Sequence, residues 1–460
     1  MPEFYCRSRH SVIAYPARGV RSMTTSIDTR RNRVEPQTQG RATIINVRIT
    51  PIAFPDPPLL NAVGCHEAWA LRAIIEVDCG DGLVGLGETY GDATHLAALG
   101  TVAPLLIGLD PFQTEHIKSV VDARLGTADA PAEKLGTAGG MGLEKAALRV
   151  FSAFEVACLD VQGQAIGRPI HDLLGGRVRD AVPFSAYLFY KWAQHPGDAP
   201  DPYGAALDPD GIVAQARTMV QTYGFQSIKL KGGVFPPDEE LDAIRALRKE
   251  FPALPLRIDP NAAWSVKTSR RVAAETQGLL EYLEDPTEGL AGMAAVAETA
   301  GMPLATNMCV VSFDHIPEAV DRGSVQVILS DHHYWGGLRQ SVRLAGICET
   351  WGLGLSMHSN SHLGISLAAM THLGAALPQL SYAADTHTPW QLGVDVVERP
   401  LTFVDGAVPV PMSPGLGVRL DRDALARLHE NYVRQGITRR DDTSYMRRFH
   451  PDFNPTKPRW

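Results

Sequence analysis

Short apolar runs recur through the second half of the chain, and a polar residue follows each of them. The runs include IKL, LRI, EYL, PLAT, VQVIL and LGLSM, and the polar residues recur roughly every 23 to 28 residues between Lys231 and Asp385. A short continuous apolar run is typical of a strand buried in a parallel sheet. A strand and a helix with their loops need about 30 residues. Polar groups at the ends of successive parallel strands form the catalytic face of a (β/α) barrel, and the pattern predicts this fold.

Helical patterns separate the predicted strands, and the part of the chain before them has a different order. DGIVAQARTMVQTYG precedes IKL, and DEELDAIRALRKEFP precedes LRI. Earlier, ATIINVRITPIAF predicts a strand, LRAIIEVDCGDGLVGLGETY predicts a hairpin that turns at Asp81-Gly82, and residues 142–166 predict a helix. We therefore expect an α+β domain at 42–180, the barrel at 181–405 and a C-terminal segment at 406–460.

The first 41 residues have a composition of their own. Seven arginines stand among the first 40 of them, against three acidic residues. This bias is typical of a transit peptide, but a disordered tail or an upstream mis-start before Met23 explains it equally simply. We expect disorder in residues 1–41.

The composition of the whole chain excludes several classes of protein. With 45% hydrophobic residues, 20% charged residues and a net charge of −8, the 460 residues give no reason to expect a nucleic-acid partner or an anionic membrane. No apolar run approaches the ~20 residues of a membrane span. The six scattered cysteines predict free thiols of a reducing compartment. We expect a cytoplasmic enzyme that acts on a small molecule and forms a homo-oligomer.

Two lysines form the most distinctive pair among the candidate catalytic residues. Lys229 and Lys231 lie two apart on a predicted strand, so both side chains point to the same side. A solvated strand end is the alternative, but a strand between two helices has no solvated face except at that end. Two ammonium groups held together lower each other's pKa, and a nearby metal ion adds to this. We predict a neutral lysine that acts as a general base near pH 7.

Three residues that offer only oxygen ligands end the next three strands: Asp259, Glu284 and Asn307. Mg²⁺ prefers carboxylate, carbonyl and water oxygens. Any one of these residues could instead cap the following helix. Three in succession beside a lysine pair predict a Mg²⁺ site.

Asp331 and His358 end the strands that follow. A carboxylate on one imidazole nitrogen fixes the tautomer and raises the basicity of the other nitrogen. His358 is therefore a candidate second base across the pocket from Lys231. We expect the neighbouring histidines to be loop or packing residues: His332, His333, His362 and His387.

These residues, in this order, resemble the mandelate-racemase-like branch of the enolase superfamily, and most closely its acid-sugar dehydratases. Asn307 as the third metal ligand is the discriminating feature, because most of the superfamily has Asp or Glu there. The resemblance covers roughly residues 42–460, on the segments KLKGG, DPNAAW, EDP, ATNM, HYW after Asp331, HSNSH, DTH…WQ, PGLGV and RRDD.

The resemblance implies a (β/α)7β barrel, capped by an α+β domain that the N-terminal part and the C-terminal segment build together. It implies Mg²⁺ on the three ligands above and a proton removed next to a carboxylate by Lys231 or, in the epimeric substrate, by His358. Lys229 and Asn261 would stabilise the resulting charge. Implied substrate contacts are Asn61, His66, Tyr187, Ser359 and Arg440, with Asp385 supporting them.

The reaction that the resemblance implies is dehydration of an acid sugar. D-glucarate, or its epimer L-idarate, would give 5-keto-4-deoxyglucarate. The family's Asp-Pro-His is Asp331-His332-His333 here, and its HSNNHFD is HSNSHLG. Another aldaric or aldonic acid such as galactarate therefore remains an alternative substrate. A non-catalytic sugar-acid-binding protein would not need two lysines, and a metal-dependent hydrolase would normally recruit histidine ligands.

Overall fold

Residues 42–126 and 146–460 are described by the computed structural model. The predicted leader lies outside the described residues, as do positions 142–145 of the predicted N-terminal helix. A three-stranded antiparallel sheet opens the described chain, in the order β1 (Ile44–Pro55), β4 (Trp69–Cys79) and β5 (Val84–Tyr90). The predicted hairpin is confirmed, and Gly82 in its turn has the positive φ, 84°, that glycine adopts without steric cost.

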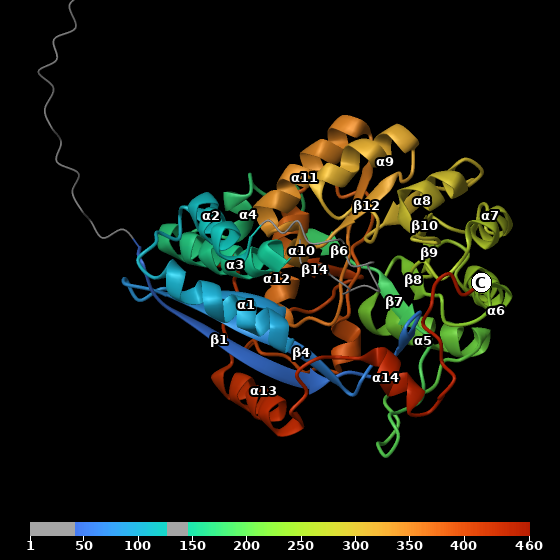
Figure 1. The fold of residues 1–460 in the computed structure, drawn as a ribbon, viewed down its shortest axis with the longest axis horizontal. Coiled ribbons are helices and arrows are strands. Elements are labelled where there is room, and N and C mark those ends of the chain that lie inside the picture. Colours follow the sequence, from blue (N-terminus) through green and yellow to red (C-terminus); the bar gives the residue numbers. More distant parts are fainter. Residues whose placement is uncertain (1–41, 127–145) are drawn as a thin grey trace, which may run out of the picture. The chain divides into compact units, whose positions relative to one another are not determined.

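The two faces of this sheet contact different helices, because successive side chains of a strand alternate. Ile75 and Val77 of β4 pack with apolar side chains of α1 (Ala93–Val102), α2 (Thr114–Leu125) and α3 (Ala146–Ile166). Glu76, between them, pairs at 2.5 Å with Arg422 of α13 (Arg422–Gln435). Figure 1 shows α1 and α3 on one side of β1 and α13 on the other. The C-terminal segment therefore packs on the N-terminal sheet, which we call the cap.

The barrel strands lie in chain order in one parallel sheet, from β7 to β13. The segment from Leu380 to Ala384 bridges both edges of this sheet, since Leu380 pairs with Leu355 of β13 and Ala384 pairs with Phe184 just before β7. The α/β barrel that the apolar runs predict is confirmed. The strands are β7 (Ala186–Phe189), β8 (Ile228–Lys231), β9 (Leu256–Asp259), β10 (Tyr282–Glu284), β11 (Leu304–Thr306), β12 (Val327–Ser330) and β13 (Gly354–Met357).

Helices cover the outside of these strands, as Figure 1 shows for α5 to α9 and α11. The first, α5 (Pro209–Tyr223), begins with the Asp208 carboxylate accepting from the Gly211 amide and ends at Gly224 in the left-handed conformation. The α-helices that follow α5 in the chain are α6 (Pro237–Glu250), α7 (Val266–Glu275), α8 (Gly289–Ala297), α9 (Ile316–Arg322), α10 (His332–Trp335), α11 (Leu338–Trp351) and α12 (Gly364–Ala376).

Short elements complete the fold. After α3 come α4 (Ile170–Leu173) and β6 (Ala181–Pro183), which pairs with β14 (Ala407–Pro409). The hairpin of β2 (Leu60–Asn61) and β3 (Gly64–Cys65) contacts α14 (Asp442–Arg447), a helix that the pattern did not predict. Among the described residues, the 3-10 turns are η1 (Ala103–Leu106), η3 (Phe313–His315) and η4 (Thr388–Gln391). Cap and barrel share one unit, Ala42–Trp460, so the boundaries at 180 and 405 stay predictions.

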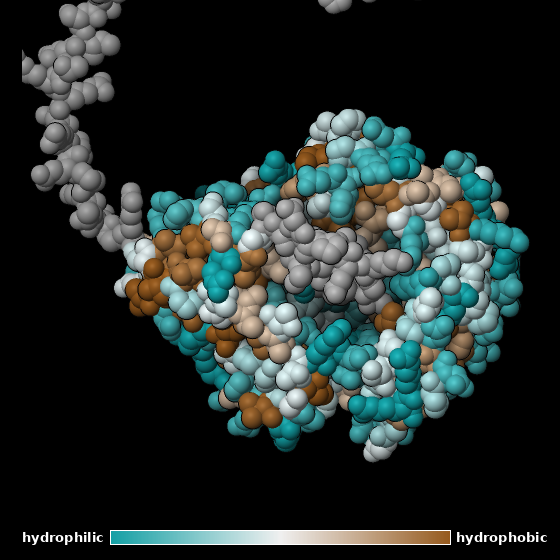
Figure 2. Space-filling model, in the orientation of Figure 1, coloured by the Kyte–Doolittle hydropathy of each residue, from teal (hydrophilic) through white to brown (hydrophobic). Residues whose placement is uncertain are grey.

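The surface of the cap carries an apolar area. Figure 2 shows brown residues gathered where Figure 1 places β1 and α1. From the start of β1 to the start of α2, the exposed large apolar residues are Ile45, Leu105, Ile107 and Phe112. In the described part of the chain, no helix is both long and apolar enough to span a bilayer.

Candidate active site

The predicted catalytic and metal-binding residues meet at one end of the barrel. Lys231, Asp259 and Glu284 are the last residues of β8, β9 and β10, and Lys231 pairs in register with Asp259. Carboxyl ends of parallel strands face the same way, so these groups share the barrel mouth. Directly after the next three strands come Asn307, Asp331 and His358.

Lys229 lies among buried carboxylates. Its Nζ is 2.8 Å and 2.6 Å from the two oxygens of Glu284 and 2.6 Å from Oδ2 of Asp385. Burial alone would lower the pKa of Lys229, but Asp385 and Glu284 raise it well above its ordinary value. For Lys229 this corrects the expected lowering of the pKa by its lysine neighbour, because the carboxylates outweigh that neighbour. Lys229 is a fixed positive charge in this arrangement.

Lys231 stands beside it with its own partners. Its Nζ donates to Oδ2 of Asp259 at 2.6 Å and to Oδ1 of Asn261 at 2.9 Å. Asn261 and Ala262 form a turn with positive φ angles of 51° and 58°, which are uncommon for residues other than glycine. The backbone amide of Asn261 donates to Oδ1 of Asp259 at 2.9 Å, which supports this turn.

The C-terminal segment holds the same turn from outside the barrel. Lys457 Nζ donates to the carbonyl oxygen of Asn261, and the Arg459 amide donates at 2.7 Å to the carbonyl of Ala263. Burial and the charge of Lys231 lower the pKa of Lys457 to about 8. The sequence analysis missed Lys457 and Arg459, because nothing in the local pattern links them to residues some 200 positions away.

The three proposed metal ligands are all buried. Both polar side-chain atoms of Asn307, Oδ1 and Nδ2, lack a hydrogen-bond partner among the described residues. Burial raises the pKa of Glu284 well above its usual value, and the charge of Asp259 adds to this. Burial also acts to raise the pKa of Asp259, but Lys231 and Lys229 outweigh this effect and lower the pKa to about 2. An unpartnered amide oxygen beside two repelling carboxylates is a donor set that fits Mg²⁺.

On the other side of the mouth, Asp331 lies between two imidazoles. Its Oδ2 is 3.0 Å from Nδ1 of His358, and its Oδ1 is 2.7 Å from Nδ1 of His333. Burial would raise the pKa of Asp331, but His333 and His358 hold it well below its usual range. The carboxylate is therefore ionised and can orient His358 as predicted.

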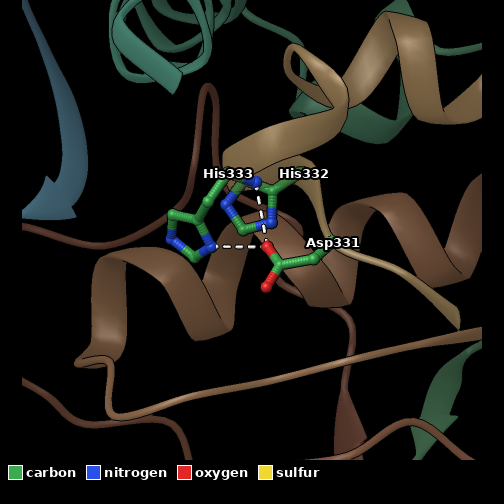
Figure 3. Close-up of side chains that lie close together, drawn as sticks. All are labelled: Asp331, His332 and His333. Carbon is green, nitrogen blue, oxygen red and sulfur yellow. Dashed lines mark hydrogen bonds and ion pairs between the residues drawn. The ribbon is translucent and has the colours of Figure 1, made fainter. Parts of the chain in front are cut away.

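Figure 3 shows Asp331 with His332 and His333, whose potential ligand atoms lie within 4.8 Å of one another. Both oxygens of Asp331 are already engaged, and Nε2 of His333 is 2.8 Å from Nη2 of Arg72. A cation placed there would face a guanidinium. The contacts of this cluster leave little room for a cation, and His333, which bonds to both Asp331 and Arg72, is more than the loop or packing residue we expected.

The surroundings of His387 agree with the loop or packing role that we expected for it. His387 is buried, with Nδ1 3.3 Å from the hydroxyl oxygen of Ser359 and its ring 5.0 Å from that of Tyr187. Burial lowers its pKa well below the usual value, so the ring is neutral.

The predicted contacts from the cap form a network of their own. Arg440 makes two hydrogen bonds to Asp442, of 2.6 Å and 2.9 Å, and one of 2.9 Å to Asp56. Asp56 also accepts from His66, and Asp442 from Asn61. Arg440 is therefore already paired, although a guanidinium has five N–H donors and these contacts use three.

Two family models match the chain. Residues 44–175 match the N-terminal domain of mandelate racemase and muconate lactonizing enzyme, and residues 211–424 match the enolase C-terminal domain-like family. A "Probable glucarate dehydratase" of Streptomyces coelicolor is 52% identical over 91% of this chain and 99% of its own length. A D-galactarolactone cycloisomerase of Agrobacterium fabrum is 28% identical over 77% of this chain and 90% of its own length.

Solved structures agree with these matches. An enolase from Thermobispora bispora, complexed with magnesium and formate, is 60% identical with a TM-score of 0.89, over 91% of this chain and all of that one. An enolase from Pseudomonas fluorescens with bound magnesium, potassium and tartrate is 51% identical with a TM-score of 0.88, over 92% of this chain and all of that one. The chain thus belongs to the enolase superfamily, in its mandelate racemase and muconate lactonizing branch.

Proposed function

We propose that the protein is a Mg²⁺-dependent acid-sugar dehydratase that converts D-glucarate, and its epimer L-idarate, to 5-keto-4-deoxyglucarate. The observation that supports the proposal is that Lys231 and His358, the candidate bases, stand at one barrel mouth, and that the strands between theirs end in the three candidate oxygen ligands. The similarity to the Streptomyces relative supports the choice of substrate.

Asp259, Glu284 and Asn307 would hold the ion. Mg²⁺ held there would act as a Lewis acid toward the substrate carboxylate, and its charge would offset those of Asp259 and Glu284. Lys229 remains close to Asp385, which at 2.6 Å gives it a second anionic partner. Lys231 has only one carboxylate partner, Asp259, and is the lysine that can give up its proton and act as base.

Each base removes the proton next to the carboxylate from its own face of the substrate. Lys231 would take it from D-glucarate, and Nε2 of His358 would take it from L-idarate. Negative charge then develops on the carboxylate oxygens, and Lys229 and Asn261 lie where they can stabilise it.

Elimination completes the reaction. In D-glucarate, the C–H bond at C5 breaks toward Lys231, and the C4 hydroxyl leaves as water with a proton from His358. The enol that remains becomes the keto acid by taking up a proton at C4. At the far end of the diacid, the two free N–H groups of Arg440 and the His66 ring are the proposed partners of the second carboxylate.

A substrate screen tests the proposal. Aldaric and aldonic acids, including D-glucarate, L-idarate and galactarate, are incubated with the protein and Mg²⁺, and keto-acid formation is measured with and without EDTA. We expect turnover of D-glucarate that EDTA abolishes and Mg²⁺ restores. Preferred turnover of galactarate would assign a different aldaric acid, and binding of an acid sugar without any proton exchange would indicate a non-catalytic protein.

A further inference from the structure

A buried arginine of the cap contacts the part of the site that His358, Asp331 and His333 form, which we call the histidine side. Arg72 of β4 is 1% exposed, its Nε donates at 3.0 Å to Glu88 of β5, and its Nη2 is 2.8 Å from Nε2 of His333. Glu88 in turn accepts from the amides of Leu363 and Ser366 at the start of α12. Arg72 is therefore fixed against the barrel.

The chemistry of these groups decides which atom donates and which accepts in each hydrogen bond. A guanidinium stays protonated and only donates, so Nε2 of His333 must accept and carries no proton. The ring of His333 is then neutral with its proton on Nδ1, which donates to Oδ1 of Asp331 at 2.7 Å. The other oxygen of Asp331, Oδ2, accepts from Nδ1 of His358 at 3.0 Å. In the neutral ring of His358 this bond leaves Nε2 without a proton, so that Nε2 is the nitrogen that accepts one.

The charge of Arg72 matters as much as its geometry. A second positive charge on His333 is disfavoured so close to a guanidinium. An imidazolium at His333 would share the negative charge of Asp331. When His333 is neutral, the negative charge of Asp331 stabilises only His358, which becomes an imidazolium when it accepts a proton.

We infer that Arg72 is a positioning residue of the cap, which fixes the tautomer of His333 and, through Asp331, keeps Nε2 of His358 as the proton acceptor. The inference rests on the proposed function, in which His358 is one of two bases. Lys231 lies on the opposite side of the mouth with separate partners, so Arg72 should influence one base and not the other.

Exchange of the substrate proton for deuterium, followed by NMR, separates the two bases. In Arg72→Met we expect exchange from L-idarate, the epimer assigned to His358, to fall by roughly tenfold or more. Exchange from D-glucarate should change by no more than roughly twofold. Arg72→Lys keeps a cationic donor and should recover much of the loss. The matched control is Arg149→Met, since the guanidinium of Arg149 lies 5.5 Å from the ring of Tyr90, against 4.9 Å for Arg72.

An equal fall for both epimers would overturn the inference, because it would mean a general structural role, and so would unchanged exchange. Arg72→Met leaves Glu88 buried without its partner, so Arg72→Met with Glu88→Gln, which removes both charges, serves if the single variant does not fold. In ¹⁵N-histidine-labelled protein, Nε2 of His333 should have the chemical shift of an unprotonated nitrogen, and a protonated Nε2 would contradict the inference. This measurement needs no substrate, so it decides the inference even if the wild type turns over no acid sugar.

Discussion

The two sides of the barrel mouth are built in different ways. On the lysine side, Lys229, Lys231 and Asp259 stand on adjacent strands and contact one another within the barrel. On the histidine side, His358 depends on Asp331 and His333, and His333 in turn contacts Arg72 in the cap, 261 residues earlier in the chain.

This difference shows how one barrel can hold two bases independently. The lysine side is organised by the order of the strands, and the histidine side is completed by a contact between domains. A change in the cap can therefore weaken one base while the other keeps its partners.

Loss of Lys231 should have the largest effect. Lys231→Ala removes the base proposed for D-glucarate, so kcat should fall by about 10²–10⁴ because a positioned general base contributes that much. Keto-acid formation measures the loss. Lys249→Ala, on the exposed end of α6, should keep normal activity, and full activity in Lys231→Ala would exclude its role as base.

Loss of Lys229 should show most clearly in stability. Lys229→Met leaves the buried carboxylates of Glu284 and Asp385 without their partner, and breaking such a pair costs about 3–5 kcal/mol of unfolding free energy. Urea denaturation measures it. The control Lys118→Met removes a partly exposed ion pair with Asp122, which contributes about 0.5 kcal/mol. Equal effects of both variants would mean that the carboxylates do not depend on Lys229.

Arg440 belongs to neither side and should affect both bases alike. Arg440→Ala removes the proposed partner of the distal carboxylate, and kcat/KM for a diacid should fall by about tenfold, since charge-assisted contacts are strong in a closed site. A six-carbon monoacid, if turned over, should lose much less. Arg439→Ala changes the exposed neighbour and serves as the control. The same small loss with both acids would give Arg440 a structural role only, within its pairs to Asp442 and Asp56.

Lys457 offers the subtlest test, on the lysine side. Lys457→Met removes one hydrogen bond to the Asn261 turn, so exchange from D-glucarate should slow by about fivefold, the worth of a typical hydrogen bond. Exchange from L-idarate should stay close to normal. Lys457→Arg retains a donor, so its rate of exchange from D-glucarate should lie between those of the wild type and Lys457→Met. A selective loss with L-idarate would break the division into two sides.

The lysine side could be predicted from the sequence because Lys231 and Asp259 end strands and Lys229 lies two residues before Lys231 on the same strand. A buried apolar run and the polar residue after it are local features, and the register of parallel neighbours then brings Lys231 beside Asp259. The same reasoning placed Asp331 next to His358.

The parts that were missed depend on contacts between distant segments. Nothing around Arg72 or Lys457 in the sequence indicates that the first reaches His333 and the second reaches Asn261. The pKa of Lys229 was misjudged for a related reason, because Asp385, which contacts Lys229, lies 156 residues away in the chain. Local pattern predicts which strand a residue ends, but the charge around it depends on the closed barrel.

The most direct test of the two-base account is proton exchange with both epimers in two variants, in the presence of Mg²⁺. Lys231→Ala should stop deuterium incorporation from D-glucarate and leave that from L-idarate, and His358→Asn should do the reverse. NMR of the recovered acids gives both rates in one experiment. Equal loss of exchange from both epimers in each variant would contradict the placement of the two bases on opposite faces of the substrate.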